Sequence, residues 1–158
     1  MDNISKERRS WNMSRIKSAN TAPELSVRSA LHRLGFRFRL HQKTLPGKPD
    51  IILPRLRTVV LVHGCFWHRH PGCVFAYVPK SRQAFWQRKF DENVARDQRV
   101  RGELRKSGRR VLVIWECQTT DSARLTARLE RALSRFQFVD PKAKNKDSAS
   151  VARNANLT

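Results

Sequence analysis

Acidic residues are few in this sequence. Its 158 residues include only 13 Asp or Glu against 33 Lys or Arg, which gives a formal net charge of +20 at pH 7. An excess of positive charge on this scale favours a polyanionic partner, most often a nucleic acid. Hydrophobic residues still make up 39% of the chain, including 4 Trp and 8 Phe. The sequence therefore predicts a folded domain with a basic surface rather than a disordered chain.

Long apolar segments are missing as well. The apolar runs at 59–62 and 111–115 are far shorter than the roughly 20 residues that a helix needs to cross a bilayer. The first residues, Met-Asp-Asn-Ile-Ser-Lys, contain no apolar signal region. We therefore expect no membrane partner and a cytoplasmic location. The 3 cysteines are an odd number, so metal binding or free thiols are expected rather than a disulfide framework.

Large apolar residues almost disappear after residue 139. The segment 140–158 carries four basic and two acidic residues, a net of +2, and is predicted to be a disordered tail. The remaining residues keep +18 of the +20 charge, so the basic character belongs to the folded part. Residues 1–20 are expected to form a basic helix that contacts nucleic acid, and residues 21–139 are expected to form the main domain.

Helices and strands are expected to alternate in the main domain. A capping box at 21–24 opens the first helix, Gly108 closes the second, and Asp121 caps the third. The strands are short apolar or alternating segments, and the second and third are close enough to form a hairpin. In chain order, these elements are expected at 21–35, 36–40, 51–53, 58–63, 82–107, 111–116 and after Asp121. This order predicts a mixed α/β fold.

The scarcity of acids makes Asp50 informative. It follows Pro-Gly-Lys-Pro and begins a predicted strand, which would present its carboxylate at the edge of a crevice. In a strongly positive chain, such a carboxylate suits a hard divalent cation such as Mg²⁺ that also meets phosphate. An aspartate in an ordinary turn would explain the same local pattern.

Histidines and cysteines gather after the predicted strand at 58–63, and the third cysteine follows the strand at 111–116. Imidazole and thiolate are the ligands that zinc prefers, and four of them make a closed tetrahedral site. The pattern predicts a structural zinc site that ties a loop to a distant strand end, with the ligands Cys65, His70, Cys73 and Cys117. Free thiols beside surface histidines are the simpler alternative.

His63 and His68 remain if zinc takes His70. They flank the strand end that is expected nearest Asp50, where an imidazole can act as a general base or steady the charge that develops on a phosphate. Each could instead be a hydrogen-bonded loop histidine or a spare zinc ligand. A further alternative is an open catalytic zinc site formed by all three histidines.

Two aromatic residues, Phe66 and Trp67, stand between the predicted zinc ligands. A metal site would hold these rings rigid beside a cationic cleft, as a wedge that stacks on DNA bases requires. Met13, on the basic helix, could insert from the other groove. Aromatic residues are more often part of a core. That role is expected for Phe85, Trp86 and Phe90.

Four segments of the sequence resemble the very-short-patch repair (Vsr) mismatch endonuclease family. They are Pro46-Gly47-Lys48-Pro49-Asp50, His63-Gly64-Cys65-Phe66-Trp67-His68, Asn93-Val94-Ala95-Arg96-Asp97 and Trp115-Glu116-Cys117. The resemblance runs from about Ser10 to Leu133, and its Gly-Cys-Phe-Trp-His string is highly specific. It implies a restriction-endonuclease-like, three-layer fold with a central mixed sheet, in which 21–139 form the endonuclease domain.

The same resemblance implies an activity and the residues that perform it. Family members nick double-stranded DNA 5′ of the thymine in T·G mismatches, which arise when 5-methylcytosine deaminates. By resemblance, Asp50 and the main-chain carbonyl of Val62 would bind catalytic Mg²⁺. His63 and His68 would be the active-site histidines, with Asp97 supporting one of them. Structural Zn²⁺ would be bound by Cys65, His70, Cys73 and Cys117. DNA contacts would come from Met13, Phe66, Trp67, Lys89 and Asn93.

Three positions leave questions open at this stage. Val62 stands where family members carry Thr, which keeps a carbonyl ligand but removes a hydroxyl. The loop at 69–73 lacks the family's uninterrupted histidine run, so the zinc ligand could be His68 or His70. Glu24 matches a family acid near the site, but its place in the capping box is a sufficient structural reason for it.

The expected protein is a monomeric, nucleoid-associated bacterial enzyme that acts on duplex DNA with a T·G mismatch and uses one or two Mg²⁺ ions. Contacts with other mismatch-repair proteins are left open. The main alternative is a non-catalytic, zinc-stabilised protein that binds nucleic acid. That alternative explains the charge and the cysteines, but it leaves Asp50, His63 and His68 without a use.

Overall fold

The computed structural model describes residues 5, 7, 8, 11 and 19–134. Met13, most of the helix expected at 1–20 and the tail expected at 140–158 lie outside these residues. No helix in the described part of the chain is long and apolar enough to cross a membrane.

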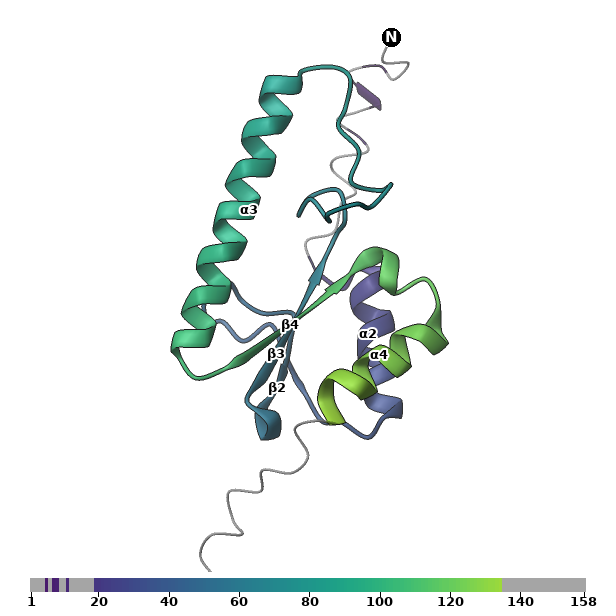
Figure 1. Ribbon diagram of the computed structural model, residues 1–158, viewed down its shortest axis with the longest axis vertical. Coiled ribbons are helices and arrows are strands. Elements are labelled where there is room, and N and C mark those ends of the chain that lie inside the picture. Colours follow the sequence, from purple (N-terminus) through teal and green to yellow (C-terminus); the bar gives the residue numbers. More distant parts are fainter. Residues whose placement is uncertain (1–4, 6, 9–10, 12–18, 135–158) are drawn as a thin grey trace, which may run out of the picture.

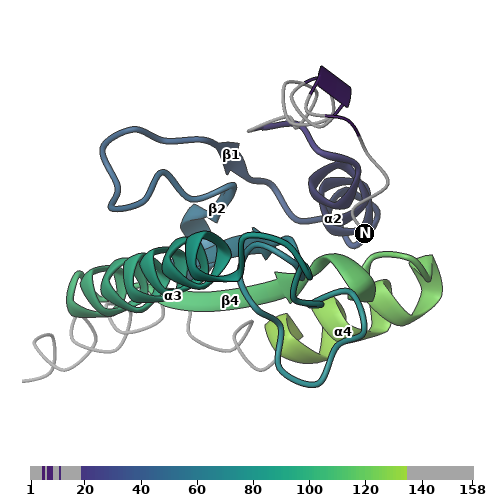
Figure 2. The same ribbon diagram turned by 90° about the horizontal axis from the view of Figure 1, so that it is seen from above.

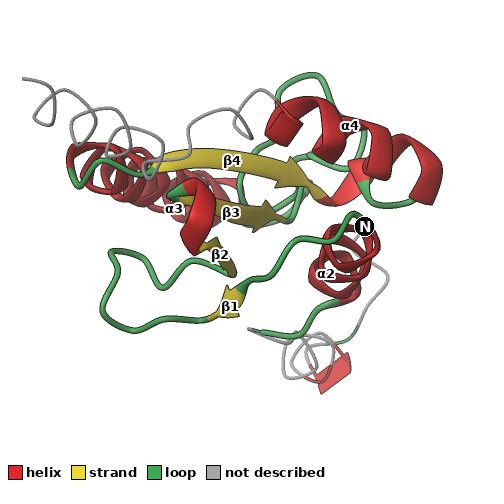
Figure 3. Cartoon of the chain, turned by 90° about the horizontal axis from the view of Figure 1, so that it is seen from below, coloured by secondary structure: helices red, strands yellow, loops and turns green. Residues whose placement is uncertain are grey.

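A mixed sheet of four strands lies at the centre of the molecule (Figure 1). The strands follow each other in space as they do in the chain, and β1 forms an outer edge (Figure 3). They are β1 (Arg39–Leu40), β2 (Ile51–Leu53), β3 (Thr58–His63) and β4 (Arg110–Trp115). The first two pairings are antiparallel, whereas β3 and β4 are parallel. A parallel pair needs a crossover, which here contains α3 (Gln83–Lys106).

Helices cover both faces of this sheet (Figures 1 and 2). α3 lies on one face, whereas α2 (Ala22–Arg33) and α4 (Ser122–Ser134) lie on the other. Neighbouring strand residues point to opposite faces, so Ile51 packs with the leucines of α2 and α4, while Ile52 packs with Leu104 of α3. The sheet between two helical layers confirms the predicted three-layer α/β fold.

The N-terminus of α2 is capped as its sequence predicts. The Thr21 hydroxyl oxygen accepts the Glu24 N–H at 3.4 Å, and the Glu24 carboxylate accepts the Asn20 N–H at 3.0 Å. The same carboxylate accepts the Thr21 hydroxyl at 2.9 Å. Glu24 therefore has the structural role expected of it, and its buried carboxylate is fixed at the start of the helix.

The strand predicted at 36–40 is mostly not a strand. β1 contains only Arg39 and Leu40, which pair with Ile52 and Ile51 of the three-residue strand β2. Phe36 and Phe38 still pack against the core, so the alternation predicted their burial although not their pairing. The hairpin of β2 and β3 is confirmed, and its turn is the short helix Pro54–Leu56.

Candidate active site and metal-binding clusters

The candidate site lies where β3 and β4 end. His63 ends β3, Trp115 ends β4, and the two residues are partners in the parallel register. The loop at 64–82 and the short helix Glu116–Gln118 therefore start side by side. The carboxyl ends of parallel strands commonly bring functional residues together in this way. Within the described residues, three groups of side chains could each hold a metal ion.

The first group contains Cys65, His70, Cys73 and Cys117, whose ligand atoms all lie within 4.8 Å of one another. Nδ1 of His70 is 3.6 Å from Sγ of Cys65 and 3.3 Å from Sγ of Cys117. In a tetrahedral zinc site with ordinary bond lengths, nitrogen and sulfur ligands are about 3.6 Å apart. The donor set and its spacing fit zinc, and they place His70 rather than His68 in the cluster.

Backbone contacts build this cysteine cluster. The Cys65 carbonyl accepts the His70 N–H at 3.1 Å, and the Cys117 N–H points to Sγ of Cys65 at 3.4 Å. Gly72, with a φ of +69°, lets the loop turn directly after His70. The His70 ring stacks on Trp115 with 4.3 Å between ring centroids. The loop after β3 is thus fitted against the end of β4.

Burial makes two of these thiols hard to ionise. It raises the pKa of Cys65 to about 12, and it raises the pKa of Cys117 as well. Burial opposes ionisation of Cys73 too, but hydrogen bonds, first that of the Phe75 N–H, outweigh it and lower the pKa of Cys73. A bound cation would favour the thiolate form of all three.

The second group contains His63, His68 and Asp97 of α3. The two imidazole rings stack with 4.0 Å between centroids, and His68 Nδ1 is hydrogen-bonded to Oδ2 of Asp97. Because an ionised carboxylate only accepts, this bond places a proton on Nδ1 of His68 and leaves Nε2 able to accept one. The group therefore offers a base that is oriented by a carboxylate.

The charges in this second group are set by its surroundings. Burial, together with the neighbouring His68 imidazole, lowers the pKa of His63 to about 4, so His63 is neutral at neutral pH. Burial works against ionisation of Asp97, but the hydrogen bond from His68 and the two nearby imidazoles outweigh it, and the pKa of Asp97 is lowered. A carboxylate thus faces a stacked pair of imidazoles.

The third group contains Glu24, His41 and Asp50. Oδ2 of Asp50 accepts the Val62 N–H at 2.8 Å, which attaches this carboxylate to the end of β3. Burial raises the pKa of Asp50, and the negative charge of Glu24 adds to the shift, although the Val62 N–H opposes it. Two carboxylates that share a partly buried site favour a bound cation, and oxygen ligands suit Mg²⁺.

His41 is a residue of this group that the sequence analysis does not identify. Its Nε2 atom is 3.9 Å from the Glu24 carboxylate. Leu40 pairs with Ile51, so the antiparallel register brings the next residue, His41, towards Asp50. The only signal in the sequence is a histidine placed directly after a strand that could pair with the strand of Asp50.

Phe66 and Trp67 lie in a cluster of aromatic rings. The Phe66 ring is 5.1 Å from that of Trp67, 5.4 Å from that of Trp86 and 5.0 Å from that of Tyr77. Phe66 and Trp67 are both half-buried, so their other sides face the solvent. Tyr77 is exposed and was not identified from the sequence.

The three aromatic residues of α3 were expected in the core, and this holds only for Phe90. Phe90 is buried, whereas Phe85 and Trp86 are half-buried. The N-terminal turns of α3 extend past the ends of the strands (Figure 1), so the sheet offers these two rings no surface to pack on. Trp86 packs against Trp67 instead, with 5.9 Å between ring centroids.

Lys89 and Asn93 lie one helical turn apart on α3. The Asn93 amide donates to the Trp67 carbonyl at 3.2 Å, which ties the aromatic loop to the helix. Lys89 is exposed and lies 3.0 Å from Glu92. That these two residues contact DNA stays a prediction. Asn93 lies beside the aromatic cluster through its bond to Trp67, and Lys89 is one turn away on the same helix.

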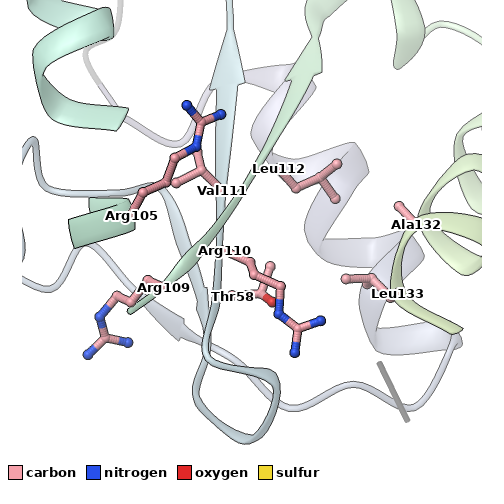
Figure 4. A pocket seen from close by; sticks show the side chains of 8 residues that line it. All are labelled: Thr58, Arg105, Arg109, Arg110, Val111, Leu112, Ala132 and Leu133. Carbon is pink, nitrogen blue, oxygen red and sulfur yellow. The ribbon is translucent and has the colours of Figure 1, made fainter. Parts of the chain in front are cut away.

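A cavity of about 370 Å³ lies at the opposite end of the sheet, where β3 and β4 begin (Figure 4). Arg105, Arg109 and Arg110 line it, but their guanidinium groups point in different directions. None of the three metal-ligand groups contributes to its lining. This cavity is therefore separate from the candidate site.

The fold and these clusters define a restriction-endonuclease-like domain with metal-binding groups at its strand ends. A family model described as DNA mismatch endonuclease Vsr matches residues 1–73. A type II nicking enzyme, V.XorIIP, of Xanthomonas oryzae pv. oryzae is 51% identical over 132 residues, which are 84% of this chain and 96% of that protein. The DNA mismatch endonuclease Vsr of Escherichia coli (strain K12) is 43% identical over 131 residues, 79% of this chain and 83% of that protein.

The chain belongs to the Vsr family and is a DNA endonuclease. The family predicted from the sequence motifs is thereby confirmed, and DNA is the substrate. The alternative of a non-catalytic nucleic-acid-binding protein is wrong. An open zinc site built from three histidines does not form among the described residues, because His70 lies with the cysteines while His63 and His68 lie with Asp97.

Proposed function

We propose that this endonuclease nicks double-stranded DNA 5′ of the thymine in T·G mismatches, by Mg²⁺-dependent hydrolysis of a phosphodiester bond. One observation carries the proposal: two chemically different groups meet at the last residues of β3. The Asp50 carboxylate accepts the Val62 N–H, and the next residue, His63, stacks on His68. A cation-binding carboxylate and a base oriented by a carboxylate thus flank one strand end.

Asp50 and the Val62 carbonyl would hold the Mg²⁺ ion. In an antiparallel pair, the N–H and C=O of one residue point to the same edge, so the Val62 carbonyl faces the side of Asp50. Ile51 pairs with Val60, and the same register continued sets Pro49 opposite Val62. Proline has no N–H to donate to that carbonyl. When bound, Mg²⁺ would polarise the phosphate and stabilise the leaving 3′-oxygen.

His68 would act as the general base. The Asp97 carboxylate accepts the Nδ1–H of His68. Nε2 of His68 is therefore free to take a proton from the water molecule whose oxygen attacks phosphorus. The bond from phosphorus to the 3′-oxygen breaks, and solvent protonates that oxygen. His63 is neutral and stacked on His68, so it would position the water or the phosphate. The negative charge of Asp97 would stabilise His68 once it is protonated.

Mismatch selection would come from the aromatic cluster. A mismatched step unstacks more cheaply than a paired one, so inserting Phe66 and Trp67 favours it. Lys89 and Asn93 would reach the neighbouring bases, and Met13, on a DNA-contacting segment at 1–20, would insert from the other groove. Zinc on the cysteine cluster would be structural. A monomer suffices for one asymmetric nick.

Replacing Asp50 with Ala is the first test of this mechanism. On an end-labelled T·G duplex with Mg²⁺, we expect the nicking rate of Asp50→Ala to fall at least about 100-fold, because the cation loses its carboxylate. Binding of the duplex should change little. The control is Asp91→Ala, an exposed carboxylate on α3 that accepts a hydrogen bond from Gln87. Cleavage by Asp50→Ala at the wild-type rate would remove Asp50 from the mechanism.

The specificity is tested on the same gel with one duplex for every mismatch, each in several flanking sequences, and a matched duplex. We expect a Mg²⁺-dependent nick 5′ of the thymine in the T·G duplex alone. Equal rates on all mismatches, or nicking in the presence of a chelator, would contradict the proposal.

A further inference from the structure

A cation, the side chain of Arg28, already contacts two members of the third ligand group, Glu24 and His41. Its Nη2 atom is 2.9 Å from Oε2 of Glu24 and 3.0 Å from Nε2 of His41, and its Nη1 atom is 2.7 Å from Oδ1 of Asn20. These partners come from the turn before α2, from α2 itself and from the segment after β1. One guanidinium group therefore joins three parts of the chain beside Asp50.

Arg28 is held in this position against a cost. Its side chain is only 12% exposed and that of Glu24 only 5%. Nε of Arg28 is buried and has no hydrogen-bond partner among the described residues, which is unfavourable. The contacts of the two Nη atoms must outweigh this loss. A guanidinium group keeps its proton in proteins, so the charge stays in place.

Arg28 decides what Glu24 and His41 can bind. A guanidinium group only donates hydrogen bonds, so Nε2 of His41 must direct its lone pair at Arg28. Oε2 of Glu24 accepts from the same Nη2 atom. Oε2 of Glu24 and Nε2 of His41 therefore both face Arg28, while Oε1 of Glu24 accepts the Thr21 hydroxyl.

The charges lead to the same result. The two carboxylates of Glu24 and Asp50 and the guanidinium of Arg28 together carry −2 + 1 = −1, His41 being left out of the count. A divalent ion on Asp50 brings the total to +1, and a second ion would bring it to +3 beside a poorly solvated arginine. Like charges at close range in a partly buried site repel strongly.

We propose that Arg28 takes the place of a second metal ion, so that the protein without DNA binds one divalent ion, at Asp50. Glu24 and His41 are then ligands of Arg28 and not of a metal. Arg28 is a positioning residue, since it acts through these two side chains. The inference rests on the proposed function only in taking Asp50 as the metal ligand.

The test counts bound ions by calorimetry, with zinc-loaded, full-length protein titrated with Mn²⁺ in the absence of DNA. We expect one ion per chain for the wild type, none for Asp50→Ala and two for Arg28→Ala, because removal of the guanidinium frees Glu24 and His41. The matched control is Arg33→Ala, on the same helix, whose guanidinium binds Ser29 and Ser122 and which should keep one ion.

Further variants keep the test decisive if Arg28→Ala does not fold. Arg28→Gln retains a hydrogen-bond donor without the charge and should also bind two ions. Glu24→Gln, with Arg28 intact, should still bind one. Two ions in the wild type, one ion in folded Arg28 variants, or no ion in Glu24→Gln would each overturn the inference. Nicking of the T·G duplex by the wild type is measured separately, so the proposed function stands or fails on its own result.

Discussion

Trp67 shows how one side chain can be prepared for DNA. Its ring packs on Trp86 and its carbonyl accepts the Asn93 amide, so the residue is fixed from both sides. Stacking of a base on an aromatic ring is worth about 1–3 kcal/mol. For Trp67→Ala we expect the preference for a T·G over a matched duplex to fall about tenfold or more, with a smaller loss of affinity for the matched duplex.

Equilibrium binding to both duplexes measures this change. Phe75→Ala is the control, because Phe75 is an exposed aromatic residue in the same loop, at 55% exposure, and should leave the preference unaltered. If Trp67→Ala weakened binding to both duplexes equally, Trp67 would not be a mismatch wedge.

Single residues differ in how far the sequence predicts their place. Cys65, His70 and Cys73 could be predicted as a group because their types are rare and they share one loop, and the structure does gather them with Cys117. Arg28 could not be predicted, because nothing near it in the chain distinguishes it from the many other arginines. Its surroundings arise from the packing of α2 against the segment after β1, a contact between distant parts of the chain.

Among the elements, the loop after β3 depends on the cysteine cluster. Cys117, from the end of β4, is the only member of the cluster outside that loop. For Cys117→Ser we expect loss of zinc and faster hydrogen exchange over 65–80, because the loop is no longer fastened to β4. Exchange in the buried β2 and β3 should change little. Nicking should fall, since His68 lies on the same loop.

Metal analysis and hydrogen exchange test this prediction, with Thr119→Ala as the control. The Thr119 hydroxyl donates to the Glu116 carbonyl just after the cluster, so this variant disturbs the same turn without removing a ligand. Full zinc content in Cys117→Ser would show that Cys117 is not a required ligand.

Elements with clear ends were predicted better than elements defined by pairing. The capping box and Gly108 gave the bounds of α2 and α3 to within a few residues, since helix ends are local features. β1 was predicted too long, because the extent of a strand depends on how much of its neighbour is available. The place of Trp86 was also missed, since it depends on where the sheet stops.

For the molecule as a whole, the +20 charge predicts strong dependence of DNA binding on salt. Each neutralised phosphate releases counterions, and a protein with several such contacts loses about 10³-fold or more in affinity between 50 and 200 mM salt. We expect this loss on matched and T·G duplexes alike, with parallel slopes, because stacking on a mismatch adds no phosphate contact. Fluorescence anisotropy at several salt concentrations measures both slopes, and a flat dependence would contradict the prediction.

The late start of β2, at Ile51, has a wider consequence. On the N-terminal side of Ile51, the neighbour of β3 is the Asp50 side chain, which accepts the Val62 N–H. Pro49 has no amide hydrogen with which to extend the hydrogen bonds between β2 and β3. A longer β2 would make a sturdier protein, but it would seal the place that we assign to the cation. Stability and turnover therefore make opposite demands on this end of β2. Substitutions that stabilise this enzyme without loss of activity are expected in other parts of the chain.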